Sequence, residues 1–302
     1  MVDGILLVNK PEGFTSFDVI AKLRGILKTK KMGHAGTLDP MATGVLPVFA
    51  GKATRAIPFL EDHDKSYTAT FRLGEETDTQ DITGTVVMRS QAPVNIRKEA
   101  VEAILPSFKG ILRQQVPMYS AVQVDGKRLY DLARKGIEVE RPVRQVEVYE
   151  LDLLAVEEER AEYTIHVACA KGTYIRTLCA DIGRALGCGA VLIRLVRTRA
   201  CGYPLEQCHS LEAIEGMARE GDMSFIAPID TAFSQWDRVA LPQEQARQFL
   251  NGAGIPIHIA GEIIVPENKL LRVYCDELFL GLAQREGDFL RSRRIFAQGD
   301  LR

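Results

Sequence analysis

One stretch of the chain, residues 31–47 with the sequence KMGHAGTLDPMATGVLP, restricts its fold and chemistry more than any other. Three of its residues are glycines, which let the backbone take positive φ or approach a ligand closely. Asp39 is the only acid between Val19 and Leu60, a window that also holds seven Lys and Arg residues. A single carboxylate in a basic, glycine-rich loop is a candidate for chemistry on a polyanion.

The same residues also have a purely structural interpretation. Asp39 could be the N-cap of a helix with Pro40 at its first position, and glycines at turns need no function. The local pattern alone leaves both interpretations open.

Length and composition indicate an ordinary globular protein. The chain has 302 residues, of which 46% are hydrophobic and 26% charged. That length allows one large domain and a small one. Its first residues lack the basic lead and apolar run of a signal peptide, and no apolar run approaches the ~18 residues of a membrane span. We therefore expect a cytoplasmic protein that has no membrane partner.

Charge is unevenly distributed along the chain. The net charge is only −2, but residues 171–199 carry six Lys and Arg residues against Asp181 alone. Together with residues 19–60, this makes two basic windows that each enclose one acid. Local distribution rather than net charge steers a phosphate backbone, so the pattern favours an RNA partner.

The six cysteines are Cys169, Cys179, Cys188, Cys201, Cys208 and Cys275. None forms a C-x-x-C pair, and neither Cys208-His209 nor His34 has further ligands at metal-binding spacing. We expect reduced, mostly buried thiols, no disulfide and no metal site.

Hydrophobic periodicity predicts an α+β fold with a mixed, largely antiparallel sheet flanked by helices and loops. The apolar and alternating segments predict strands at residues 4–9, 65–73, 86–88, 151–170 and 191–197. Helical spacing predicts helices from Ser16 (as N-cap) to Leu27 and at residues 97–105 and 243–250. Residues 172–176 lead into a further predicted helix that continues through Leu186.

Two further divisions follow from changes in residue composition and pattern along the chain. A boundary near residues 228–237 separates residues 1–235 from residues 236–302, where short strands and turns suggest a small β-barrel. Residues 117–148 differ from their surroundings: a turn at Asp125-Gly126 precedes a predicted helix that carries Lys127, Arg128, Arg134 and Lys135. That helix could be a solvated amphipathic element or a surface that contacts RNA.

The segment GHAGTLDPMATGVLPV closely resembles the signature of the TruB family, the bacterial tRNA pseudouridine-55 synthases. KSY (65–67), GTYIR (172–176) and LVRTR (195–199) match the same family in order. The resemblance implies a pseudouridine synthase fold for residues 1–235, with a thumb-like insertion at about 117–148. NGAGIPI and LRVYCDELFLGLAQ resemble a PUA-like RNA-binding domain at 236–302. ACGYP after Arg199 and Met41 depart slightly from the family pattern.

The resemblance also implies catalytic roles. Asp39 would be the nucleophile that acts on the ribose, either by covalent attack or by the glycal route, and it must stay ionised. Arg176 would pair with it, Asp81 would hold that arginine, and Lys65 would support the site. No redox change or phosphate transfer occurs, so no cofactor is expected.

Substrate-binding roles follow in the same way. Tyr67 and Tyr174 would contact the flipped base, and Tyr67 could also accept a proton from C5; without the resemblance both would be interpreted as core residues. Leu195 would line the pocket. His34 would fill the space that the extruded nucleotide leaves in the T-loop.

The implied function is isomerisation of the T-loop uridine of tRNA by a monomer that binds the T-arm without a guide RNA. One alternative is a guide-dependent synthase of the dyskerin/Cbf5 type, although residues 117–148 are longer than expected for it. A second is a non-catalytic tRNA-binding or tRNA-folding protein. A third is a hydrolase that releases free uracil.

Overall fold

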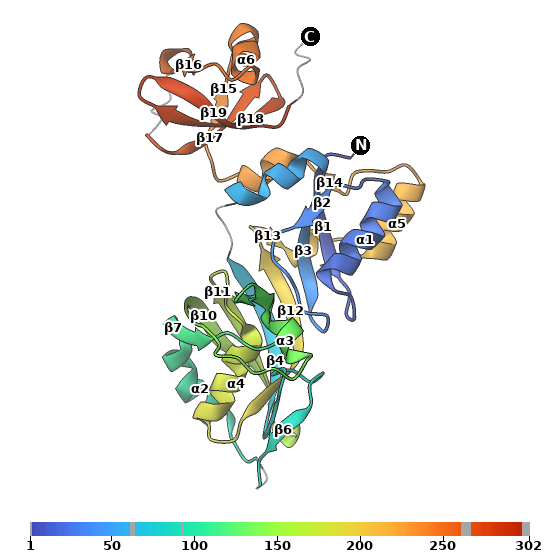
Figure 1. Cartoon of the computed structure of the whole chain (residues 1–302), viewed down its shortest axis with the longest axis vertical. Helices are drawn as coiled ribbons and strands as arrows, with labels where there is room; N and C mark the ends of the chain where they lie inside the picture. Colours follow the sequence, from blue (N-terminus) through green and yellow to red (C-terminus); the bar gives the residue numbers. More distant parts are fainter. Residues whose placement is uncertain (1, 61–63, 92–93, 261–266, 298–302) are drawn as a thin grey trace.

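The structure, a computed structural model, describes residues 2–60, 64–91, 94–260 and 267–297. In Figure 1 the chain is elongated, with a second, smaller sheet at one end and the hairpin that contains β6 at the other. One large sheet runs through the rest of the molecule.

This large sheet has ten strands in the order β14-β1-β3-β12-β4-β11-β10-β7, with β13 on β12 and β2 on β3. Every pairing is antiparallel except that of β12 with β3. The predicted α+β class with a mixed, largely antiparallel sheet is confirmed. The strands are β1 (Gly4–Lys10), β2 (Met32–His34), β3 (Thr43–Ala50), β4 (Lys65–Leu73), β7 (Gly110–Gln115), β10 (Val143–Glu157), β11 (Glu162–Cys169), β12 (Ala190–Ala200), β13 (Tyr203–Pro204) and β14 (Ile226–Ala227).

Helices cover the two halves of the sheet separately (Figure 1). The helices α1 (Ser16–Leu27) and α5 (Leu211–Arg219) share one apolar cluster with β1 and β3. The helices α2 (Lys98–Ile104) and α4 (Ile175–Ala185) share another with β4, β10, β11 and β12. Short 3-10 turns complete this part of the chain: η1 (Gly51–Arg55), η2 (Ile57–Phe59), η3 (Leu105–Phe108), η4 (Glu158–Arg160), η5 (Leu205–Gln207) and η6 (Ile229–Phe233).

The start of α1 corrects one prediction. The N-cap is Thr15 rather than Ser16: Thr15 accepts from the backbone N–H of Asp18, and Asp18 accepts from that of Thr15. This reciprocal capping box satisfies two N–H groups at the helix terminus, so Thr15 is the better cap. Ser16 is buried and bonds elsewhere.

Residues 117–148 also differ from expectation. Lys127 and Arg128 lie in a short hairpin, formed by β8 (Gln123–Val124) and β9 (Lys127–Arg128), rather than on a helix. The predicted turn at Asp125-Gly126 joins the two strands, and both turn residues have positive φ, which favours a hairpin. Only α3 (Leu129–Ala133) is helical. A second hairpin, β5 (Glu75–Thr77) with β6 (Val86–Arg89), lies at the far end of the molecule.

The smaller sheet has five strands in the order β15-β17-β18-β19-β16 and curls into a half-barrel around its own core. Its elements are β15 (Arg238–Ala240), α6 (Gln243–Leu250), β16 (Ile255–Pro256), η7 (Ile257–Ala260), β17 (Leu270–Cys275), β18 (Leu278–Glu286) and β19 (Phe289–Ile295). Residues 261–266 and 298–302 of the predicted second domain lie outside the described residues. The division at residues 235/236 itself stays a prediction.

Aromatic side chains join the two sheets. Phe233 stacks on Trp236 with ring centroids 4.9 Å apart, and it also contacts Phe279 on β18 and Phe296, which directly follows β19. These rings belong to a cluster that includes Phe49 and residues of β1 and η1. The small sheet therefore packs on the large one through apolar side chains.

Candidate active site

Asp39 lies in a loop, residues 35–42, between β2 and β3. The loop contains a turn at Pro40 and Met41 but no helix, so the alternative in which Asp39 caps a helix is wrong. Ser16 fixes the loop from α1, because its Oγ accepts from the backbone N–H of Leu38 at 2.9 Å. The N–H of Gly13 donates to the Pro40 carbonyl at 2.9 Å.

Arg176 forms the ion pair with Asp39 that the resemblance implies. Its Nε lies 2.8 Å from Asp39 Oδ2; the arginine side chain is 4% exposed and the carboxylate 37%. Two further donors of the same guanidinium bind the carbonyls of Thr79 (2.8 Å) and Tyr119 (2.9 Å). Arg176 is therefore held rigidly, while the carboxylate keeps an accessible face.

Asp81 is close to this pair but mainly organises its own loop. Its Oδ2 lies 3.9 Å from Arg176 Nε. Its Oδ1 accepts from the backbone N–H of Thr83 and the hydroxyl of Thr79, each at 2.9 Å. Since the Thr79 carbonyl binds Arg176, the carboxylate of Asp81 supports the arginine through its charge and through the loop.

Tyr67 comes from β4 and is buried in the same apolar cluster as Leu38, Met41 and Leu195. Burial raises the pKa of Tyr67 to about 12, and the charge and hydrogen bond of Arg197 oppose that shift. The phenol is therefore neutral at physiological pH. Tyr67 and Leu195 thus lie on the apolar side of the Asp39 loop.

Tyr174 stands immediately before α4, two residues from Arg176. Gln114 of β7 holds its backbone with two hydrogen bonds, one to the N–H (2.7 Å) and one to the carbonyl (3.0 Å). Its side chain packs on a small cluster of Val116, Leu129 and Leu132. Tyr174 therefore connects the loop that leads into α4 with residues 117–148.

His34 ends β2 directly before the loop, and Lys65 lies beside Gly36 of the loop. Burial, and then the charge of Arg197, lowers the pKa of His34, whose buried Nδ1 has no hydrogen-bond partner among the described residues. Burial likewise lowers the pKa of Lys65. A Cβ placed on Gly36 would lie 3.1 Å from Lys65 Cε, so the glycine lets lysine and loop pack closely.

Two buried cations beneath the loop escaped the sequence analysis as site residues. The ammonium of Lys10 donates to the carbonyls of Pro11 (2.9 Å), Phe14 (2.6 Å) and Pro40 (3.2 Å). Arg197 is completely buried and also donates to backbone carbonyls. For Arg197 a signal existed: it follows Leu195 by two residues on a strand, so both point to the buried face.

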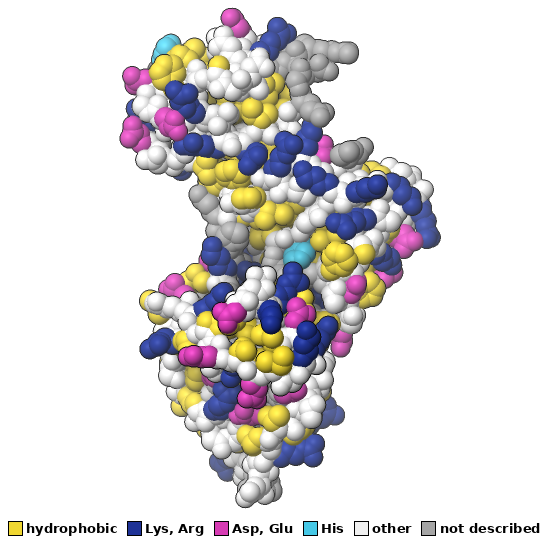
Figure 2. Space-filling model, viewed as in Figure 1, with side chains coloured by type: hydrophobic (Ala, Val, Ile, Leu, Met, Phe, Trp, Pro, Cys, Tyr) yellow, Lys and Arg dark blue, Asp and Glu magenta, His cyan; other side chains and the backbone are white. Residues whose placement is uncertain are grey.

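Basic side chains gather on one face of the molecule, where the smaller sheet meets the part that contains α1 and η1 (Figure 2).

In the described part of the chain, no group of three or more His, Cys, Asp or Glu side chains could hold a metal ion. No described helix is long and apolar enough to span a membrane. None of the six cysteines, all of which lie in the described residues, forms a disulfide.

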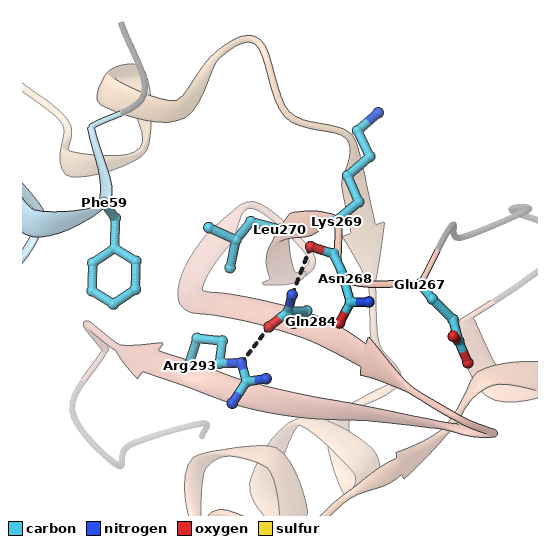
Figure 3. A pocket seen from close by; sticks show the side chains of 7 residues that line it. All are labelled: Phe59, Glu267, Asn268, Lys269, Leu270, Gln284 and Arg293. Carbon is cyan, nitrogen blue, oxygen red and sulfur yellow. Dashed lines mark hydrogen bonds between the residues drawn. The ribbon is translucent and has the colours of Figure 1, made fainter. Parts of the chain in front are cut away.

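A pocket of about 550 Å³ lies away from the Asp39 loop, between η2 and the smaller sheet. Figure 3 shows Phe59 facing Leu270 and Gln284 across it. The Gln284 amide is already satisfied, because it donates to the Asn268 carbonyl and accepts from Arg293, each at 2.6 Å. None of the candidate site residues lines this pocket.

Comparison with known proteins places the chain in a family. The model for "TruB family pseudouridylate synthase (N terminal domain)" matches residues 24–175, and that for "tRNA pseudouridylate synthase B C-terminal domain" matches residues 176–246. The tRNA pseudouridine synthase B of Syntrophomonas wolfei is 47% identical over 88% of this chain and 89% of that protein. That of Azoarcus sp. (strain BH72) is 41% identical over 98% and 96%.

Solved structures share the fold. The Cbf5-Nop10-Gar1 complex contains a chain that matches with a TM-score of 0.72 and 24% identity, over 98% of this chain and 85% of that one. An H/ACA RNP bound to a substrate RNA gives a TM-score of 0.73 and 23% identity, over 98% and 86%. The family models and the curated relatives together define a pseudouridine synthase. The chain belongs to the TruB family.

Proposed function

We propose that this enzyme isomerises the T-loop uridine of tRNA to pseudouridine, with Asp39 as the group that acts on the ribose. Family membership and relatives named tRNA pseudouridine synthase B support the reaction and the substrate. The observation that carries the assignment of Asp39 is its ion pair with Arg176, in which the arginine is 4% exposed and the carboxylate 37%. The buried guanidinium holds one side of the carboxylate in place, and the accessible face can meet a substrate.

The reaction needs groups of the kinds that surround Asp39. The C1′–N1 bond of uridine breaks, the uracil rotates, C1′ bonds to C5, and the proton on C5 leaves while N1 gains one. Atoms and charge balance without an oxidant or a second substrate. The chain must therefore supply a carboxylate, a pocket that retains the detached ring, and a proton acceptor.

Tyr67, Tyr174 and Leu195 are the proposed pocket residues. Flipping a base out of its stack costs a few kcal/mol. Stacking on an aromatic ring returns roughly 1–3 kcal/mol per base. Tyr67 and Leu195 share one apolar cluster, which supports a role at the base. His34, on the strand that leads into the loop, is proposed to fill the vacated position in the T-loop.

The Asp39→Asn variant tests the assignment. It keeps the size of the side chain but removes its charge, so we expect no detectable pseudouridine in an unmodified tRNA transcript, with tRNA affinity changed by no more than a few-fold. Conversion is measured by mapping the modified nucleotide, and affinity by filter binding. The control is Asp152→Asn, an exposed carboxylate on β10 that pairs with Lys109.

The same assay separates the competing functions. Turnover by Asp39→Asn would refute the role of Asp39. Free uracil from the wild type would indicate a hydrolase, and binding without conversion a tRNA-binding protein. The reaction contains no guide RNA, so conversion also excludes a guide-dependent synthase. The proposal also includes that the enzyme acts on the T-arm as a monomer in the cytoplasm. It includes the division into two domains at residues 235/236.

A further inference from the structure

Arg197 occupies the seam of the large sheet. It lies on β12, directly beside Gly44 of β3 on one side and Tyr67 of β4 on the other. These two neighbours belong to the two halves of the sheet, because β12 is the strand that separates β3 from β4. The contact with β3 is close: a Cβ on Gly44, whose φ is +103°, would lie 2.2 Å from the Arg197 carbonyl oxygen.

The guanidinium of Arg197 brackets the Asp39 loop. Nη2 donates to the Gly36 carbonyl at 3.0 Å, Nη1 to that of Thr37 at 3.4 Å, and Nε to that of Val45 at 2.7 Å. Two of these acceptors precede Asp39 and one follows it. A lysine in this place has a single nitrogen and lacks the planar array of donors that reaches all three carbonyls.

The same guanidinium also acts on Tyr67. Residues directly opposite on antiparallel strands project from the same face, so both side chains lie on the side of the loop. The Tyr67 side chain is a hydrogen-bond partner of Arg197. One buried cation thus contacts the loop that carries the carboxylate and the phenol proposed to meet the base.

We propose, on the basis of the function above, that Arg197 is a positioning residue that fixes the Asp39 loop relative to Tyr67. It does not contact the reacting atoms. Its loss lets the loop and the phenol move independently, which lowers the rate of the chemical step more than it lowers the affinity for RNA. Misplacement by about 1 Å can cost on the order of 100-fold in rate.

The test is a double-mutant cycle with Arg197→Lys and Tyr67→Phe, measured under single-turnover conditions on unmodified tRNA. We expect Arg197→Lys to slow conversion by about 100-fold with an unchanged half-saturating enzyme concentration. In the Tyr67→Phe background the same substitution should cost much less, because the coupled partner is already lost. Arg72→Lys on β4, which pairs with Glu75 outside the site, is the matched control.

A second pair of variants leaves every charge in place. A Cβ at Gly36, whose φ is +86°, would lie 3.1 Å from Lys65 Cε and 3.4 Å from Arg197 Nη1, whereas one at Gly110, with φ +83°, would meet nothing within 4 Å. Both alanine variants carry similar backbone strain. Only Gly36→Ala also crowds Lys65 and Arg197, so only this variant should slow conversion. This pair keeps the proposal testable if Arg197→Lys does not fold.

The outcomes distinguish this proposal from the one on which it rests. If the wild-type protein converts no tRNA, the proposed function is wrong. An active wild type with an unaffected Arg197→Lys variant overturns the positioning role alone. Rate losses that simply multiply in the cycle, or equal losses for Gly36→Ala and Gly110→Ala, overturn it as well, because each indicates general destabilisation.

Discussion

Lys10 shows how a single buried charge can organise a loop while it opposes stability. Its side chain is fully buried, and its ammonium reaches three backbone carbonyls, one of them in the Asp39 loop. Burial lowers the pKa of Lys10 to about 8, and the charge of Asp39 partly opposes this shift. The folded protein therefore releases a proton that the unfolded chain still binds.

This gives a signed pH prediction. Between about pH 8 and the ordinary lysine value of 10.5, the unfolded state binds more protons at Lys10 than the folded state does. The free energy of unfolding contributed by this group therefore rises with pH in that window. Because Lys10→Met removes the contribution, the wild type should gain stability relative to the variant from pH 8 to pH 10, as measured by urea unfolding. A difference independent of pH would contradict the prediction.

The contact between Asp39 and Arg176 was predicted through the family resemblance, because both residues lie within specific motifs of that family. Arg197 and Lys10 were not identified because charged side chains are usually exposed, and burial depends on which strands flank them. The alternation with Leu195 was a signal, not used in the sequence analysis, that Arg197 lies on a buried face. Only the structure shows that backbone carbonyls satisfy its donors there.

Individual elements were predictable where the periodicity was long. The strand at residues 65–73 and the helix at residues 243–250 have the predicted bounds. The predictions were wrong at two places. Thr15 rather than Ser16 caps α1. Lys127 and Arg128 follow a two-residue turn and form a strand of a hairpin rather than part of a helix. Such choices depend on side-chain hydrogen bonds and turn geometry, which periodicity does not report.

Residues 117–148, the predicted thumb-like insertion, give a prediction at the scale of an element. Leu129 is fully buried in the small cluster that joins α3 to Val116 and Tyr174. Leu129→Ala should cost about 2–5 kcal/mol of packing free energy. We expect that so small a cluster does not stay packed after this loss. We expect a KM for tRNA raised several-fold and faster protease cleavage within residues 117–142, with little change in the melting temperature of the large sheet.

The control for this variant is Leu154→Ala, since Leu154 is 56% exposed on β10. An unchanged KM and an unchanged cleavage pattern for Leu129→Ala would show that this cluster does not hold the insertion in place.

At the scale of the whole molecule, the only tryptophan reports on how the two sheets meet. Trp236 is 3% exposed and stacks on Phe233, which contacts Phe279 of the smaller sheet. Phe279→Ala should loosen this contact, shift the tryptophan emission to longer wavelength and split thermal unfolding into two transitions. Phe289→Ala, at a ring that is 42% exposed, should do neither. A single, unshifted transition for Phe279→Ala would show that the sheets unfold together without this ring.

The strand order also has a consequence for how the chain is made. Because β12 (Ala190–Ala200) separates β3 from β4, the first 100 or so residues to leave the ribosome contain both neighbours but not the strand between them. Contacts so distant in sequence form slowly. The nascent chain therefore carries Asp39 on a loop that lacks its hydrogen bonds to Arg197 until translation has passed residue 200, and two nascent sheet edges remain unpaired until the same late strand is made.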